Sequence, residues 1–232
     1  MLKTADSLAF VDLAEVDPIA RLLDMSEKGD EWHVDDSSLE EYSVLAGLPE
    51  DFSTGLGGMI LRSIGNGSGN VGIDIAGGTN GAALQQLLKP GTLEKALVTN
   101  YTDARSDETK AVVGLDHIEG DLCDRATWEE IDGWIDENAP GGLSLVMHRP
   151  AGTLQDLPAP FYAGAFRFLL ERTRPGGLHF LQIPEPLVIP SPERSLKPVY
   201  EEIEDSVEVL FSNVNPDSDF PVIPAHVLLR KN

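Results

Sequence analysis

VGIDIAGGTNGAAL, residues 71–84, places a short apolar run with β-branched residues directly before a loop of small residues. The apolar run predicts a buried strand, and the residues after the loop have the pattern of a helix. Small residues at Ala76, Gly77, Gly78 and Gly81 let the backbone of the loop approach a ligand closely. Amide groups at the start of the following helix attract a carboxylate or a phosphate. The stretch therefore predicts a strand, a ligand-binding loop and a helix.

Strand and helix patterns alternate through the rest of the chain. Four more strand candidates follow, ALVTNYT, GLDHIEGDL, LSLVMH and LHFLQIP, and the helical segments are GAALQQLL, ATWEEIDGWIDENA and FYAGAFRFLLERT. Two further strand candidates, VEVLFSN and AHVLLRK, come last. Alternation of this kind predicts an α/β fold with a seven-stranded, mostly parallel sheet and helices on both faces. Ligands bind such sheets at the carboxyl ends of the strands, near the point where the strand order reverses.

Helix signals precede the opening stretch. Asp17-Pro18 is typical of an N-cap followed by proline in the first turn, and it predicts a helix that ends near Gly29. Ser37 and Glu40 have the spacing of a capping box and predict a second helix. The apolar face of that second helix would consist of Leu39, Tyr42, Leu45 and Ala46.

The charge of the chain narrows the range of partners. Seventeen basic residues against 39 acidic ones give a formal net charge of −22, which repels nucleic-acid phosphates and anionic membrane surfaces. No apolar run approaches the roughly 18 residues that cross a bilayer. Acidic residues interrupt the N-terminal stretch where a signal peptide needs an apolar core, which predicts a cytoplasmic protein. The lone Cys123 and the scattered histidines predict no metal site.

Two classes of cofactor fit the loop after the first strand. Ala76, Gly78 and Gly81 match the glycine fingerprint of NAD(P)-binding oxidoreductases if alanine stands for the first glycine. Asp74, two residues before the loop, would only repel a pyrophosphate. The free ammonium group of S-adenosylmethionine, in contrast, can hydrogen-bond to this acid directly or through water. The acid therefore favours S-adenosylmethionine, with NAD(P) as the alternative.

At these residues the chain resembles the class I S-adenosylmethionine-dependent methyltransferases. Their first motif is an acid, any residue, and then glycines at alternating positions. The acid falls on Asp74 and the glycine positions on Ala76, Gly78 and Asn80, with Gly81 just beyond. The resemblance implies a Rossmann-like fold and S-adenosylmethionine as cofactor.

The resemblance extends through the later strands. In GLDHIEGDLCD, Asp121 matches the family acid that contacts the adenine amino group, and the backbone of Leu122 would meet the ring. The turn Pro175-Gly176-Gly177 is similar to the family's entry into its fifth strand. The two closing strands are similar to the antiparallel edge of the family's sheet.

One position departs from the family pattern. The family ends its second strand with an acid that binds both ribose hydroxyls, whereas ALVTNYTDAR has Asn100 near that place and Asp103 three residues later. Asn100 can donate and accept hydrogen bonds, so it is favoured as the ribose residue, and Asp103 stays open.

Methyl transfer is an in-line displacement that depends on holding the acceptor against the methyl group. For a hydroxyl acceptor, His148 at the end of LSLVMH is the candidate general base; alternatively it packs or caps the loop with Arg149. The loop MHRPAG lacks the Asn/Asp-Pro-Pro-aromatic run of amino-methylating nucleic-acid enzymes. With the negative charge, this predicts a small-molecule methyl acceptor. A noncatalytic protein with the same fold is the remaining alternative, and a homo-oligomer stays open.

The glycine-rich residues 65–70 predict a boundary near residue 70. Residues 1–69 would then form an N-terminal helical extension, and residues 70–232 the Rossmann-like S-adenosylmethionine-binding domain. The extension, with Trp32, His33 and Tyr42, either covers the acceptor as a lid or only stabilises the domain.

Overall fold

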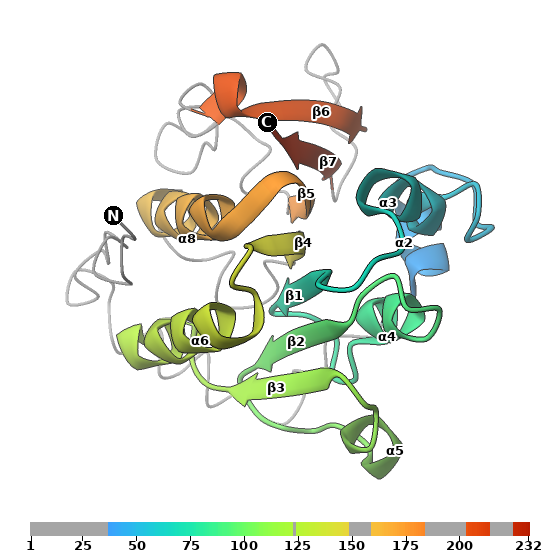
Figure 1. Ribbon diagram of the computed structural model, residues 1–232. Coiled ribbons are helices and arrows are strands. Elements are labelled where there is room, and N and C mark those ends of the chain that lie inside the picture. Colours follow the sequence, from blue (N-terminus) through green and yellow to red (C-terminus); the bar gives the residue numbers. More distant parts are fainter. Residues whose placement is uncertain (1–36, 123, 149–158, 184–202, 214–224) are drawn as a thin grey trace.

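A single sheet organises the part of the chain that the structure, a computed structural model, describes: residues 37–122, 124–148, 159–183, 203–213 and 225–232. Among these residues, seven strands lie in the order β3-β2-β1-β4-β5-β7-β6 (Figure 1). The strands are β1 (Val71–Ile75), β2 (Lys95–Asn100), β3 (Leu115–Glu119), β4 (Leu143–His148), β5 (Thr173–Ile183), β6 (Val207–Ser212) and β7 (Ala225–Lys231). Strands β1 to β5 are parallel, and β7 runs antiparallel to β5 and β6. The predicted seven-stranded, mostly parallel sheet is confirmed.

The first strand lies in the middle of the sheet, between β2 and β4. Every residue of β1 and of β4 is buried, because helices cover both faces of the sheet there. This burial explains why VGIDI and LSLVMH are almost continuously apolar. The chain runs outward from β1 to β3 and then crosses back to β4, so the strand order reverses beside β1.

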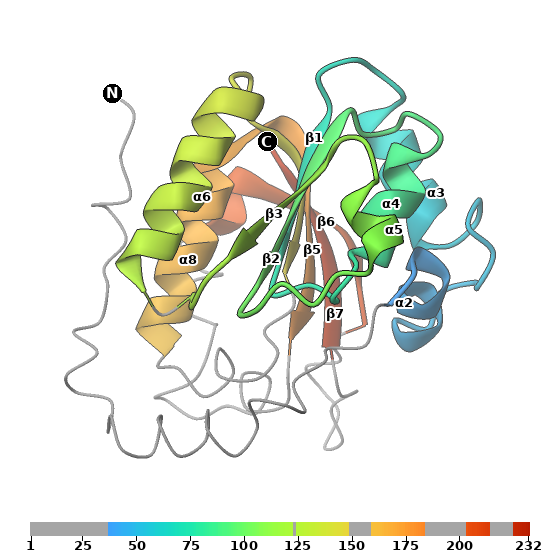
Figure 2. The ribbon, with the colours of Figure 1, turned by 90° about the horizontal axis from the view of Figure 1, so that it is seen from below.

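Helices lie on both faces of the sheet, as predicted (Figure 2). One side carries α2 (Leu39–Leu45), α3 (Leu56–Ile64), α4 (Ala82–Leu88) and α5 (Asp107–Lys110), and the other carries α6 (Arg125–Asn138) and α8 (Ala159–Arg172). A 3-10 turn at Glu204–Ser206 precedes β6. None of the described helices is long and apolar enough to cross a membrane.

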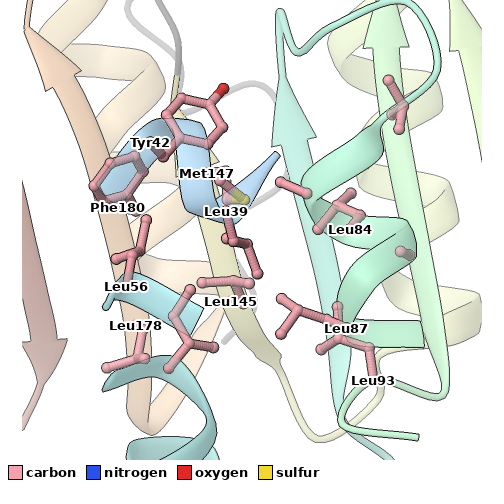
Figure 3. Close-up of a cluster of buried hydrophobic side chains, with 14 of the residues drawn as sticks. Leu39, Tyr42, Leu56, Leu84, Leu87, Leu93, Leu145, Met147, Leu178 and Phe180 are labelled. Carbon is pink, nitrogen blue, oxygen red and sulfur yellow. The ribbon is translucent and has the colours of Figure 1, made fainter. Parts of the chain in front are cut away.

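Each face of the sheet has its own hydrophobic cluster. On the face of α6 and α8, Ile73 and Val146 pack with Trp128 and Leu169. The other cluster joins helices α2, α3 and α4 to the sheet (Figure 3), and its members include Leu39, Tyr42, Leu56, Ile60, Leu84, Leu87, Leu145, Met147 and Phe180. Side chains alternate between the two faces along a strand, so β4 contributes Val146 to the first cluster and Leu145 and Met147 to the second, whereas the apolar side chains of β1 all lie in the first.

Helices α2 and α3 are part of the same core as the sheet. The ring of Tyr42 from α2 packs edge-on against Phe180 of β5, with 5.4 Å between the ring centroids. Tyr42 is fully buried. The described part of the predicted N-terminal extension is therefore a layer on the sheet, which favours the stabilising role for these two helices.

Helix α2 begins one residue later than the sequence pattern predicts. The capping box uses Ser38 and Glu41: the Glu41 amide donates to Ser38 Oγ at 3.1 Å, and the Ser38 amide donates to Glu41 Oε2 at 2.7 Å. Ser37 and Glu40 are not the capping pair. Leu39 and Tyr42 pack in the core as predicted, whereas Leu45, predicted to lie on the same apolar face, is 48% exposed.

Strand β5 contains a further difference. It begins at Thr173, and the turn Pro175-Gly176-Gly177 is an irregularity within the strand, because the pairing jumps from Leu143↔Thr173 to Leu145↔Leu178. Gly176 has a φ of +78°, a conformation that favours glycine. The predicted helix from Asp17 to Gly29 lies outside the described residues, as do Trp32, His33, Cys123 and Arg149.

Candidate functional site

The loop after β1 folds back onto Asp74. This aspartate is only 2% exposed, and a Cβ atom on Gly77 would overlap its carboxyl group. Ala76 adopts a φ of 55°, in the left-handed region that L residues occupy at a cost of about 1 kcal/mol. The Ala76 amide donates to Thr99 Oγ1 of β2 at 3.1 Å, which holds the strained residue in place. The loop thus encloses a buried carboxylate tightly.

Gly78 and Gly81 complete this loop. Both are buried, and the Gly81 amide donates to the Gly78 carbonyl at 3.1 Å. Gly81 has a φ of +63°, and a Cβ atom on it would lie 2.5 Å from Cγ2 of Val98. The close packing explains why small residues are needed at both ends of the loop.

The end of β2 is tied to the same loop. Asn100 Nδ2 donates to the Gly77 carbonyl at 2.8 Å. On its other side, Asn100 Oδ1 lies 3.2 Å from Nε2 of His117, which comes from β3. The structure therefore brings the glycine loop close to both Asp74 and Asn100.

Asn80 makes a different set of contacts. Its side-chain oxygen accepts hydrogen bonds from the Ser106 amide at 3.0 Å and from Thr109 Oγ1 at 2.9 Å. Both donors belong to α5 or its N-cap. The side chain of Asn80 thus fastens the loop to α5.

Asp103, the alternative ribose residue, is held by Arg105. The Arg105 Nε and a terminal nitrogen donate to the two carboxylate oxygens at 2.8 and 3.0 Å. These hydrogen bonds lower the pKa of Asp103 well below its usual range. Lys110 lies 3.8 Å from the same carboxylate. Of these two candidates, Asn100 is the one that hydrogen-bonds to the glycine loop in the described part of the chain.

Asp121 and Leu122 follow β3, with only Gly120 between the strand and Asp121. Parallel strands end at the same edge of a sheet, so this pair lies at the edge where β1 and β2 also end. Asp121 is half-buried, whereas Leu122 is 8% exposed and belongs to the core. The Leu122 carbonyl accepts a hydrogen bond from the Trp128 indole at 2.7 Å, which fixes the backbone at this position.

His148, the predicted general base, is the last residue of β4, and its side chain lies on the face of the sheet opposite Asp74. Its neighbour Met147 packs with α2 and α4 and pairs with Asp74, whereas the His148 ring faces Phe166 of α8 at 6.3 Å. The imidazole is 2% exposed, and burial lowers its pKa to about 4. This surrounding favours the packing role that the sequence left open, and the general-base role stays a prediction.

Sequence patterns alone did not single out Thr99, His117 or Tyr101. Thr99 contacts the loop from its place next to the end of β2, and that place near the carboxyl end of a strand was a signal. His117 contacts Asn100 from the middle of β3 and carried no such signal. Tyr101 follows Asn100 and is 59% exposed, an unusual setting for an aromatic ring at a strand end. Among the described residues, no group of three or more His, Cys, Asp and Glu side chains is placed to hold a metal ion.

Neither a scan against protein-family models nor a search of curated proteins finds a match to this chain. Solved structures do match its fold. MycE methyltransferase from the mycinamycin biosynthetic pathway, solved with Mg and SAH, has a TM-score of 0.52 at 15% identity. That alignment covers 97% of this chain and 62% of MycE.

N-methyltransferase NodS from Bradyrhizobium japonicum, solved with S-adenosyl-L-homocysteine, has a TM-score of 0.50 at 13% identity, with 87% of this chain and 92% of NodS covered. An rRNA methylase from Streptococcus thermophilus is also similar, with a TM-score of 0.48 at 12% identity over 75% of this chain and 92% of that one. At such identities a structural match defines the fold and leaves the acceptor unassigned. The chain therefore has the Rossmann-like methyltransferase fold that its sequence resembles.

Proposed function

We propose that this protein is an S-adenosylmethionine-dependent methyltransferase that acts on a small-molecule acceptor. The observation that carries the proposal is the buried Asp74 under a glycine loop, beside the point where the strand order reverses. Open α/β sheets bind ligands at such a point. The bound cofactor would supply an electrophilic methyl group. SAH in the solved structures of MycE and NodS supports a cofactor of this class.

The residues present fit this cofactor. A buried carboxylate suits the ammonium group at the methionine end, because a charge-assisted hydrogen bond is strong away from water. Gly77 and Gly78 let the backbone approach it closely. Asn100 would face the ribose, and Asp121 with the Leu122 backbone would meet the adenine. The exposed ring of Tyr101, the residue after Asn100, would offer a flat surface to the cofactor.

A small-molecule acceptor agrees with the charge of the chain. A formal net charge of −22 opposes the approach of a phosphate backbone and removes the main nonspecific contribution to nucleic-acid binding. The chain's role would be to hold the acceptor in line with the methyl group and to exclude water. An acceptor that is already a nucleophile needs no base for this reaction.

Calorimetric titration with S-adenosylmethionine, S-adenosylhomocysteine, NAD and NADP tests the proposal. We expect the first two to bind with dissociation constants on the order of 1 to 100 μM, a range typical of enzyme substrates. Binding of a dinucleotide alone would favour the oxidoreductase alternative. No binding of any of the four at millimolar concentration would identify a noncatalytic protein with this fold.

Asp74→Asn is expected to weaken S-adenosylmethionine binding by about 10- to 100-fold, because the substitution removes the negative charge that meets the ammonium group. Affinity for 5′-methylthioadenosine, which lacks that group, should stay within about threefold, since the adenosine contacts are retained. The measurement is calorimetry with both ligands. Glu130→Gln, on the exposed side of α6, is the matched control because it removes one charge away from the site. Equal losses for both ligands would contradict the role of Asp74.

His148→Ala tests the two roles of the histidine at the end of β4. We expect a loss of about 2 to 3 kcal/mol in the free energy of unfolding, because the substitution leaves a cavity beside Phe166. Turnover should fall by less than about tenfold, since a base with a pKa far below the working pH drives proton transfer weakly. The assay requires a screen of phenols, amines and carboxylic acids as acceptors. A fall of about 100-fold or more in a folded variant with unchanged cofactor affinity would restore the general-base role.

A further inference from the structure

Three groups from separate strands or loops form a continuous line of hydrogen bonds at the predicted ribose position. The Gly77 carbonyl belongs to the loop after β1, Asn100 is the last residue of β2, and His117 lies in β3. Asn100 Nδ2 is 2.8 Å from the Gly77 oxygen, and Asn100 Oδ1 is 3.2 Å from His117 Nε2. The line crosses from β3 to the glycine loop.

The chemistry of these groups fixes the direction of both hydrogen bonds. A backbone carbonyl only accepts, so the amide nitrogen of Asn100 must face Gly77. The amide oxygen of Asn100 then faces His117, and this oxygen also only accepts. His117 must therefore donate, and its proton must lie on Nε2. The reverse orientation of Asn100 would set two oxygen atoms 2.8 Å apart.

The charges around His117 leave this arrangement intact across neutral pH. Burial is the largest influence and lowers the pKa of His117, Arg105 and Lys110 act in the same direction, and Asp103 and Glu119 oppose them. Near pH 7 the imidazole is therefore largely neutral. Protonation would add a hydrogen to Nδ1 and keep the one on Nε2, so both forms of His117 donate to Asn100.

We propose that His117 is a positioning residue for the cofactor: it holds Asn100, which in turn holds the glycine loop. Where the family has a charged acid, this chain has a neutral side chain whose orientation is set by an imidazole. Asn100 keeps one N–H and one oxygen lone pair, a donor and an acceptor that suit the two hydroxyls of a ribose. The role in cofactor binding rests on the proposed function, whereas the hydrogen-bond direction does not.

Two-bond ¹H–¹⁵N correlation spectra of the unliganded protein test the direction. We expect the His117 ring to carry its proton on Nε2 at pH 7.5, with Nδ1 unprotonated. His117→Gln assigns the signals, because it removes those of one histidine only. A neutral His117 with its proton on Nδ1 would overturn the inference, whether or not the protein binds a cofactor.

Affinity for S-adenosylhomocysteine, measured by calorimetry, tests the positioning role. His117→Leu cannot donate and should weaken binding by about tenfold, because the partly buried amide oxygen of Asn100 loses its partner and Asn100 can rotate. In His117→Gln a side-chain amide can donate in place of Nε2, so binding should stay within about threefold. Thermal unfolding identifies any variant that fails to fold.

A merely structural His117 would give a different pattern. Equal affinities in folded His117→Leu and His117→Gln variants would overturn the positioning role. Wild-type affinity should be nearly constant between pH 6 and 8, because both protonation states of His117 donate; a tenfold fall with decreasing pH that is absent in His117→Gln would also overturn it. A wild-type protein that binds no cofactor would contradict the proposed function, and the spectra would still decide the direction.

Discussion

Gly77→Ala is expected to lower the affinity for S-adenosylhomocysteine by more than about 100-fold. The new methyl group would overlap the carboxyl group of Asp74, which is buried and has little room to move. Relief of the overlap requires a shift of the loop or of the carboxylate. Because the two are packed together, either shift changes the position of one relative to the other in the proposed cofactor site. Calorimetric titration of the purified variant measures the loss, and circular dichroism verifies that the variant is folded.

Gly133→Ala is the matched control for this substitution. Gly133 lies in the middle of α6, and a Cβ atom there would meet nothing within 4 Å. The control should bind the cofactor normally and gain about 0.5 to 1 kcal/mol in stability, because alanine favours a helix over glycine.

A double variant tests whether the effect of Gly77→Ala comes from the overlap between the new methyl group and the Asp74 carboxyl group. Asp74→Ala combined with Gly77→Ala removes the overlap, so the stability lost in the single variant should return while the affinity stays low. Normal affinity in a folded Gly77→Ala variant would contradict the predicted site.

Acidification is expected to destabilise the protein through two buried histidines. Burial lowers the pKa of His148 to about 4 and is the main cause that lowers the pKa of His179 to about 3. In the unfolded chain both titrate near the ordinary value of about 6.5. Below that pH the unfolded state binds protons that the folded state does not, so stability is full above pH 6.5 and falls as the pH decreases toward the folded pKa values.

At pH 4.5 the loss should amount to about 2 to 3 kcal/mol for each histidine. Urea denaturation at a series of pH values gives the free energy of unfolding. His148→Gln and His179→Gln, which are neutral at every pH, should each reduce the slope against pH by about one proton. This comparison separates the histidines from the many carboxylates, whose protonation also changes the charge of the chain. Identical slopes in wild type and variants would contradict the prediction.

The order and type of the main elements could be predicted from local patterns. A strand covered on both faces is mostly apolar, and the residues of VGIDI and LSLVMH follow this pattern almost throughout. The glycines of the loop likewise indicate close packing, because a Cβ atom on Gly77 would overlap Asp74 and one on Gly81 would overlap Val98. The candidate site next to β1 was predictable for the same reason, since its core is a single stretch of chain.

Contacts between distant residues were decided only by the tertiary structure. His117 meets Asn100 because β2 and β3 pair in a particular register, and no pattern within either strand states that register. Asn80 accepts a hydrogen bond from Thr109, which lies beyond α4 and β2 in the sequence, so its side chain joins the loop to α5.

The sequence by itself determined the strand that ends in His148, the helices α4, α6 and α8, and the loop that encloses Asp74, because periodicity and residue size act locally. Only the tertiary structure decided that His148 faces Phe166, on the face opposite Asp74, and that α2 and α3 share a core with the sheet. The physical reason is that a side chain's surroundings depend on which elements pack against its face. That choice is made by the burial of apolar surface over the whole molecule, and no single segment encodes it.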